Sequence, residues 1–194
     1  EQTRTASAKI MQQLNNSPNV LGWSLDGDFE KGGGHLGEAI KKADTNDEYI
    51  NANPTFLPTA YFDIYDLEVI DGRAWNDSID NQYNYDLIIN ESAARALGIT
   101  DIKNERIQSK DRIMYSAYQD MSVNPSYNIV GVIKDCRVGH LSKKVVPTIY
   151  LYSEPILEYI NPGTSLVIRY QEGKQREVIE LLSKLRNEVS GDGE

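Results

Sequence analysis

The sequence carries one strong constraint on its fold, an amphipathic pattern over residues 174–189. Apolar residues recur there at the spacing of one helix face, at Val178, Leu181, Leu182, Leu185 and Val189. Glu, Lys and Arg residues occupy the opposite face. A helix of this kind is stable when its apolar stripe packs against other elements. We therefore predict a C-terminal amphipathic helix over residues 174–189.

The N-terminal end of the sequence shows a related pattern. Residues 3–15 predict a second amphipathic helix, because apolar residues recur at every fourth position from Ala6 to Leu14. A run of Asn, Ser and Pro residues ends this helix, and residues 20–25 then predict a short strand. At the other end of the chain the order is reversed, because a predicted strand at residues 166–170 precedes the last helix.

The middle of the chain mixes short strands with polar connections. Strands are predicted at residues 87–89, near residues 113–118, at residues 129–133 and at residues 148–152. Residues 55–70 alternate less cleanly, but their aromatic and β-branched side chains give them a strand-like character. Residues 76–86 are polar and are expected to be exposed.

One short helix is predicted after the strand at residues 87–89. Asn90 is a suitable N-cap residue, and Glu91 lies in the first turn, where a negative charge is stabilising. Gly98 stands where a glycine commonly ends a helix. Gly131, inside a predicted strand, indicates that another segment approaches the backbone closely.

Together these elements predict an α+β fold in which the two ends of the chain come together. We assign residues 1–52 and 146–194 to a discontinuous outer subdomain, built from helix and strand at one end and strands and helix at the other. Residues 53–145 are predicted to form a smaller inserted α+β subdomain. The 194 residues are enough to bury a sizeable core.

Composition excludes some classes of function. The formal net charge is −9, and the nearest thing to a basic patch is Lys143 with Lys144, so nucleic acid is not an expected partner. A single cysteine cannot form an internal disulfide, which fits the cytosol or a bacterial extracytoplasmic domain. No apolar run reaches the ~18 residues of a membrane span. The sequence does not begin with Met, which is typical of a processed or excised domain.

The stretch of the sequence that most resembles an active site contains Asp135, Cys136, Arg137 and His140. A nucleophilic cysteine needs a nearby base and a lowered pKa, which His140 and Arg137 could supply. However, Cys136 directly follows an apolar strand, where cysteine behaves as a small apolar residue. One Cys and one His, with His35 far away in the sequence, match no zinc spacing. We therefore predict no catalytic residue and no metal ligand here.

Several further patterns resemble sites without matching them. The glycine-rich residues 26–37 lack the Lys-Ser/Thr pair of a phosphate-binding loop. Asp26 and Asp28 could ligate calcium, but a calcium loop numbered from Asp26 has Lys31 where it needs Gly and Gly37 where it needs Glu. Four carboxylates of the strand-like segment could form an acid–base pair for hydrolysis, but they are expected on the solvated face of a half-buried strand; they are Asp63, Asp66, Glu68 and Asp71. Twelve dispersed tyrosines suggest an amphipathic surface.

Three segments, in this order, resemble the extracytoplasmic core domain of MacB/FtsX-like ABC transporter permeases. They are "YFDIYDLEVIDGRAW" at residues 61–75, "LIINESAARALGI" at residues 87–99 and "YNIVGVIKDCRVGHLSKKVVPTIYLY" at residues 127–152. The last contains the family's Ile-Val-Gly-Val-x-x-Asp strand, a turn at Asp135 and Gly139, and Pro147 before the next strand. Cys136 departs from the family, which usually carries an aromatic residue there, as does the segment at residues 104–107.

This resemblance implies a place and a role. The domain would lie between the first and second transmembrane helices of a permease, on the periplasmic side of a bacterial inner membrane. Its outer subdomain would be porter-like. The helix at residues 3–15 would continue the first transmembrane helix outward, and the helix at residues 174–189 would lead back toward the second. It would be non-catalytic, without cofactor or metal, and would couple cytoplasmic ATP hydrolysis to export or signalling. The implied partners are the transmembrane helices, a second permease copy, a cytoplasmic ABC ATPase and a periplasmic adaptor or lipoprotein.

Two alternatives remain open from the sequence. An extracellular small-ligand sensing module would require a pocket lined by tyrosines with convergent polar groups. A thiol enzyme would require an accessible and activated Cys136.

Overall fold

The computed structural model describes residues 2–25, 37–81, 85–110, 126–136, 144–152 and 166–191. The chain contains both helices and runs of consecutive strands, as the α+β prediction requires, so this class is confirmed. In order, the described elements are α1 (Gln2–Asn16), β1 (Val20–Leu25), β2 (Glu38–Lys42), β3 (Ile50–Leu57), α2 (Ala60–Tyr65), β4 (Val69–Gly72), β5 (Asp86–Asn90), α3 (Glu91–Ala96), β6 (Arg106–Ser109), β7 (Ser126–Ile133), β8 (Thr148–Tyr152), β9 (Leu166–Tyr170) and α4 (Gln175–Gly191).

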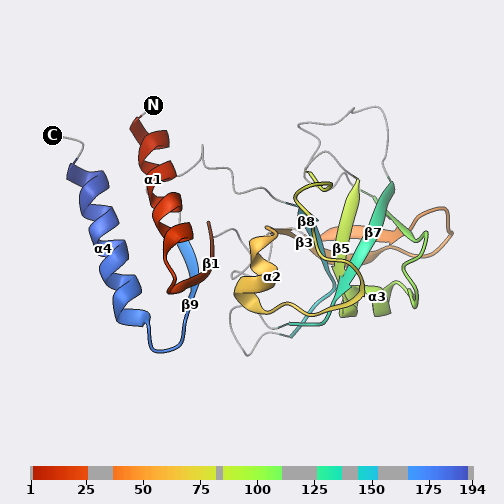
Figure 1. Ribbon diagram of the computed structural model, residues 1–194. Coiled ribbons are helices and arrows are strands. Elements are labelled where there is room, and N and C mark those ends of the chain that lie inside the picture. Colours follow the sequence, from red (N-terminus) through yellow and green to blue (C-terminus); the bar gives the residue numbers. More distant parts are fainter. Residues whose placement is uncertain are drawn as a thin grey trace.

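The two ends of the chain form one unit, made of α1, β1, β9 and α4, which we call the helix unit (Figure 1). β1 and β9 pair in antiparallel fashion, with Val20 opposite Tyr170 and Leu25 opposite Leu166. The apolar stripes of the two helices supply the buried residues, which are Leu14 of α1 and Val178 and Leu185 of α4. Both terminal helices and both strands predicted from the sequence are thus confirmed.

Six of the described strands close into a ring, which we call the barrel. The order is β7, β5, β8, β3, β2 and β6, and β6 pairs back to β7. β6 pairs with the first part of β7, and β4 pairs in antiparallel fashion with its last part, from Gly131 to Ile133. The pairs β3–β8 and β5–β7 are parallel, and the other pairs of the ring are antiparallel. Closure pairs every strand of the ring on both sides, which removes open sheet edges.

Alternating apolar residues fill the barrel, because successive side chains of a strand point to opposite faces. The inward set belongs to one continuous core and includes Ile40, Ala52, Leu87, Ile89, Ile107, Ile129, Ile149 and Leu151. α3 joins this core with Ala93, Ala94 and Leu97. The helix that follows β5 therefore closes part of the barrel interior.

The outward side chains of the same strands form a second core. Ile88 of β5 and Tyr150 and Tyr152 of β8 pack with Tyr61 of α2 and Trp75. α2 also lies against β1, where a side-chain atom of Ile64 would come within 3.3 Å of a Cβ built at Gly22. α2 thus lies between the barrel and the helix unit (Figure 1).

Gly131 confirms the close approach expected from the sequence. A Cβ atom at this position would lie 2.2 Å from the backbone carbonyl oxygen of Arg73. Arg73 donates its backbone N–H to the Val130 carbonyl at 3.0 Å, so the segment after β4 lies directly on β7. Gly72, in the same segment, has a φ of +70°, which glycine adopts without strain.

The strand-like interpretation of residues 55–70 is wrong in its centre. β3 ends at Leu57, and α2 follows, with Tyr61 and Tyr65 one helical turn apart and in edge-to-face contact at 5.1 Å between ring centroids. Aromatic pairs at this spacing stabilise a helix, although aromatic composition alone favours a strand. Asp66, in the left-handed region with a φ of 55°, then ends the helix.

The expectation that residues 76–86 are exposed is also wrong at Asp80, which is only 3% exposed. The strands β2 and β6 were not predicted, and the strand expected near residues 113–118 lies outside the described residues. The division at residues 52 and 146 stays a prediction. The sheet pairing places β2 and β8 in the barrel, although those boundaries assign both strands to the outer subdomain.

Candidate functional site

Cys136 lies just beyond β7, half-buried against the outer core that contains Tyr150 and Ile133. Burial raises the pKa of its thiol, and the neighbouring negative charge of Asp135 raises it further. A nucleophilic cysteine needs the opposite shift, because the thiolate is the reactive form. Arg137 and His140, its proposed helpers, lie outside the described residues. The geometry therefore favours the packing role over the thiol-enzyme alternative.

Asp135 does more than form a turn, the role expected for it. Its carboxylate accepts hydrogen bonds from the backbone N–H and the hydroxyl of Ser92, at 2.9 and 2.5 Å. The guanidinium of Arg95 lies 3.8 Å from the same carboxylate. Because Ser92 is in the first turn of α3, Asp135 holds the start of that helix to the end of β7.

Asn90 is the N-cap of α3, as predicted. Its side-chain oxygen accepts from the backbone N–H of Ala93 at 2.8 Å and also from Thr148 at 2.9 Å, while its amide donates to the carbonyl of Val146 at 2.9 Å. Two of the three segments that resemble the permease family, residues 87–99 and 127–152, therefore meet at the start of α3. Sequence reasoning recognised these residues separately and did not predict their contact.

The segment that ends in Trp75 is held by an ion pair. Arg73 contacts both carboxylate oxygens of Asp80, at 2.5 and 2.8 Å, and Asp80 also accepts from the backbone N–H of Asn76 at 2.7 Å. Burial raises the pKa of Asp80, but the hydrogen bonds and charge of Arg73, with the Asn76 N–H, outweigh it and hold that pKa below its usual value. The pair is structural, since it fixes the loop against β7.

The carboxylates considered as an acid–base pair occupy unrelated positions. Asp63 lies on α2 and Asp66 ends it, rather than both lying on a strand. Glu68 forms an ion pair with Lys134 at 2.7 Å, and Asp71 of β4 accepts the backbone N–H of Ile102 at 3.3 Å. In the part of the chain that the structure describes, no three His, Cys, Asp or Glu residues gather as metal ligands would.

The remaining sequence candidates contribute little. Of the glycine-rich residues 26–37, only Gly37 is described, and a Cβ there would collide with the side chain of Asn51. The prediction that the tyrosines form an amphipathic surface is wrong for four of them. These four are buried in the two cores, namely Tyr61, Tyr127, Tyr150 and Tyr152. These four residues pack rather than recognise a ligand.

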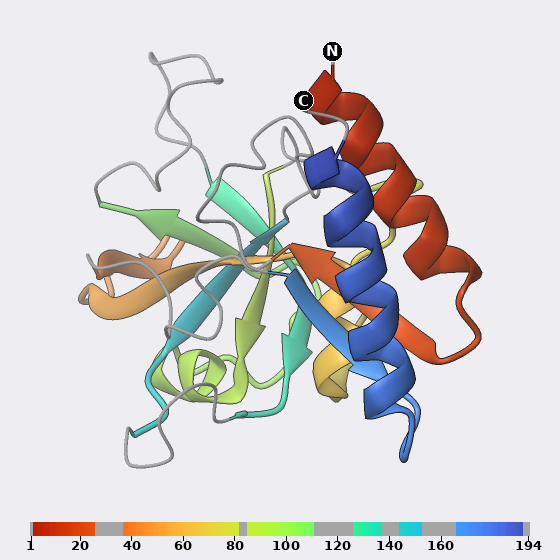
Figure 2. The ribbon, with the colours of Figure 1, turned by 90° about the vertical axis from the view of Figure 1, so that its left-hand side faces the viewer.

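The arrangement of the terminal helices is the feature with the clearest functional geometry. α1 and α4 lie side by side, and the start of α1 and the end of α4 are at the same end of the molecule (Figures 1 and 2). Among the described residues, no helix has the length and apolar character needed to cross a bilayer. The barrel extends from the opposite side of α2 (Figure 1).

No protein-family model matches the sequence, and no curated protein matches it. Solved structures do. The periplasmic region of MacB from Actinobacillus actinomycetemcomitans is 14% identical with a TM-score of 0.55, over 95% of this chain and 74% of that one. The extracellular domain of the noncanonic ABC-type transporter YknZ from Gram-positive bacteria is 14% identical with a TM-score of 0.52, over 94% and 83%.

A third similar structure is a domain assigned to a permease protein from Porphyromonas gingivalis. It is 16% identical with a TM-score of 0.52, over 90% of this chain and 75% of that one. At such identities the likeness is one of fold. The predicted likeness in fold to MacB-like extracytoplasmic domains is therefore confirmed, whereas the split porter-like arrangement stays a prediction.

Proposed function

We propose that this domain is the extracytoplasmic part of an ABC transporter permease, between its first and second transmembrane helices. It would lie on the periplasmic side of a bacterial inner membrane. The observation that carries the proposal is the common end of α1 and α4 (Figure 2). Two helices that leave the same membrane must enter the domain from one side, and helices at opposite ends of the molecule would rule this out.

The role that fits this geometry is mechanical and not catalytic. A closed, filled barrel moves as one body, because packed interiors deform little. Movement of the membrane helices would reach it through α1 and α4, as a rigid-body displacement. The energy would come from a cytoplasmic ABC ATPase, and the displacement would serve export or signalling. The other partners would be a second permease copy and a periplasmic adaptor or lipoprotein.

The sensing alternative receives no comparable support. It requires a pocket lined by tyrosines, whereas the pocket beside β4 and α3 is lined by other residues. A thermal-shift screen with small metabolites would still distinguish the two, because tight binding of a metabolite stabilises the folded state.

The location can be tested in cells with the full-length gene product that contains this chain. Cys136 is replaced by Ala, and the exposed Asp101 is replaced by Cys. We expect a maleimide that does not cross the inner membrane to label the Asp101→Cys protein in intact cells. The Cys136→Ala protein alone is the background control. Labelling that appears only after the inner membrane is broken would refute the proposal.

A further inference from the structure

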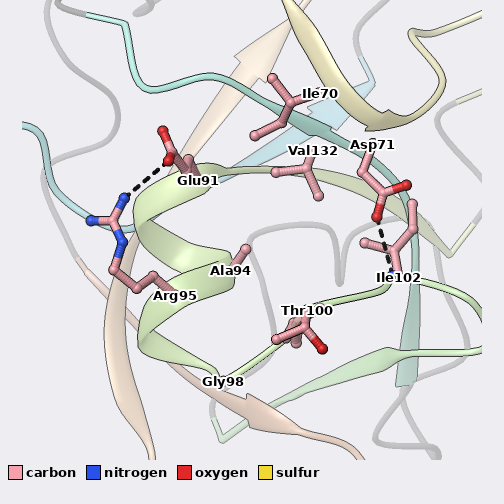
Figure 3. Close-up of a pocket in the computed structure, with 10 residues that line it drawn as sticks. Ile70, Asp71, Glu91, Ala94, Arg95, Gly98, Thr100, Ile102 and Val132 are labelled. Atoms are coloured by element: carbon pink, nitrogen blue, oxygen red, sulfur yellow. Dashed lines mark hydrogen bonds and ion pairs between the residues drawn. The ribbon is translucent and has the colours of Figure 1, made fainter.

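A surface pocket of about 460 Å³ lies beside α3 and β4 (Figure 3). Its lining comes from three separate parts of the chain: β4, the helix α3 with the loop after it, and β7. The residues are Ile70, Asp71, Glu91, Ala94, Arg95, Gly98, Ile99, Thr100, Ile102 and Val132. The sequence gives no sign of this pocket, because it forms only when these segments fold together.

The floor of the pocket is apolar and continuous with the barrel core. Ala94, Ile99 and Val132 are nearly buried and belong to that core. Ile70, by contrast, is 46% exposed and extends the apolar surface outward along one side. A pocket this open leaves part of any occupant in water, whereas sites for small molecules bury most of the ligand.

An irregularity in β4 shapes this side of the pocket. The pairing of β4 with β7 shifts register between Val69 and Asp71. A bulge of this kind re-aims side chains, so that consecutive residues no longer point to strictly opposite faces. Ile70 and Asp71 consequently both line the pocket, one with an apolar side chain and one with a carboxylate.

The charged residues on the rim of the pocket differ in their pairing. Arg95 is engaged by Glu91 at 3.3 Å and by Asp135 at 3.8 Å. Asp71 lies across the pocket, with Val132 and Ala94 between (Figure 3). Among the residues that the structure describes, its carboxylate accepts only the backbone N–H of Ile102, at 3.3 Å. Within the described residues Asp71 forms no ion pair. The rim therefore has one uncompensated carboxylate, on a chain whose net charge is −9.

We propose that this pocket binds a peptide segment of a partner protein in which an apolar side chain stands next to a Lys or Arg residue. The apolar side chain lies on the floor, and the neighbouring cation pairs with Asp71. The openness of the pocket suits a side chain presented by a longer chain, and the negative charge of the domain favours encounter with a cationic partner. The proposal goes beyond the location proposed above and does not depend on it.

The test is a titration of the 194-residue chain, followed by amide NMR signals, with acetylated and amidated tetrapeptides. Gly-Leu-Lys-Gly is expected to shift the signals of Ala94, Ile99 and Ile102 in a saturable manner. Gly-Leu-Glu-Gly and Gly-Gly-Lys-Gly are expected to bind more weakly. Asp71→Asn should weaken the Leu-Lys peptide about two- to fivefold, the range for an exposed ion pair.

The matched control is Glu68→Gln, which removes an exposed carboxylate that pairs with Lys134 and does not line the pocket. It should leave the affinity unchanged. Asp71 is exposed, so Asp71→Asn should leave the fold intact, and the unshifted remainder of its spectrum checks this. Equal affinity for the Lys and Glu peptides, or no effect of Asp71→Asn, would overturn the proposal. So would tighter binding of free hexylammonium than of the peptide, or no saturable shift up to roughly 10 mM peptide, tenfold above a millimolar Kd.

Discussion

The barrel and the helix unit are built on different principles. In the barrel, a closed ring of strands surrounds side chains such as Leu87, Ile89 and Ile149, which are fully buried. In the helix unit, two strands and two long helices leave Leu21 and Ile179 more than half exposed. Stability should therefore be concentrated in the barrel, and the helix unit should be the part that opens and moves more easily.

This difference suits the mechanical role proposed for the domain. A rigid body connected to its membrane anchors by a less stable unit can change orientation without losing its own structure. α2 is the element on which the connection depends, because it packs on the barrel through Tyr61 and lies against β1. Substitutions in each region can show whether the barrel and the helix unit differ in this way.

The largest effect is expected from matched core truncations. Leu87→Ala in the barrel should lower the free energy of unfolding by about 4 kcal/mol, and Leu185→Ala in α4 by about 2 kcal/mol, within the range for buried leucines. Both side chains are nearly completely buried, at 0% and 3% exposure. A difference between the two losses in stability therefore reports how far the neighbouring residues relax into the cavity that each substitution leaves. Urea unfolding measures both losses.

Hydrogen exchange provides the control for this pair. Amides of β5 and β8 should exchange only through global unfolding, whereas those of α4 should exchange through smaller openings. Equal losses for the two substitutions, together with equal protection, would contradict the comparison between the regions.

The ion pair beneath Trp75 should give the next effect. Asp80→Asn leaves the Arg73 guanidinium beside a buried neutral group, and should cost about 2 kcal/mol, less than a fully buried pair because the Arg73 side chain is 38% exposed. The folded-state pKa of Asp80 lies below its ordinary value of 3.8. The stabilisation that the ionised Asp80 contributes is therefore fully present above pH 3.8. It is lost as the pH falls from there through the lower folded-state pKa.

Unfolding experiments at several pH values test this prediction. The stabilities of the natural protein and Asp80→Asn should converge as the pH drops below about 4. Glu48→Gln, at an exposed position, is the control and should change little. A difference that stays constant into acid would show that the charge of Asp80 is not the cause.

Two glycines separate steric from conformational effects within the barrel region. Gly131→Ala places a Cβ 2.2 Å from a backbone oxygen and should cost about 2–3 kcal/mol. Gly98→Ala meets no atom within 4 Å, but its φ of +66° is unfavourable for alanine, so about 1 kcal/mol is expected. Thermal unfolding ranks the two. A Gly98→Ala loss as large as that of Gly131→Ala would argue against close packing at β7.

The smallest effect is expected on the outer face of the helix unit. Arg176 and Glu180 form an ion pair one helical turn apart at 3.0 Å, with side chains 90% and 65% exposed. Arg176→Ala should therefore cost about 0.3 kcal/mol at low salt and less at high salt. Gln175→Ala serves as the control for helix propensity. A loss above about 1 kcal/mol would mean that this face is covered by something in the folded protein.

The elements that sequence reasoning found are those whose signal is local. The terminal helices have a clear period, the strand at residues 129–133 is apolar on both faces, and Asn90 with Gly98 marks both ends of α3. β2 and β6 were missed, because "EAIKK" and "RIQS" each contain a single large apolar residue. α2 was misread, because its aromatic residues favour a strand by composition and a helix only by spacing.

The sites were less predictable than the fold, because they depend on contacts between distant residues. Nothing local shows that Asn90 and Asp135 both hold α3, or that Asp80 pairs with Arg73 in a buried position. The pocket joins β4 to the loop after α3 in the same way. Pairings of this kind are set by topology, which a single sequence does not reveal.

The pairing of β1 with β9 also sets the order in which the protein can form during its synthesis. Val20 cannot pair in the two-stranded sheet until Tyr170, its partner, has been synthesised. All strands of the barrel lie between these two residues and leave the ribosome before β9 does. The barrel can therefore mature first, while the earlier-made β1 remains without its strand partner until the last part of the chain has been translated.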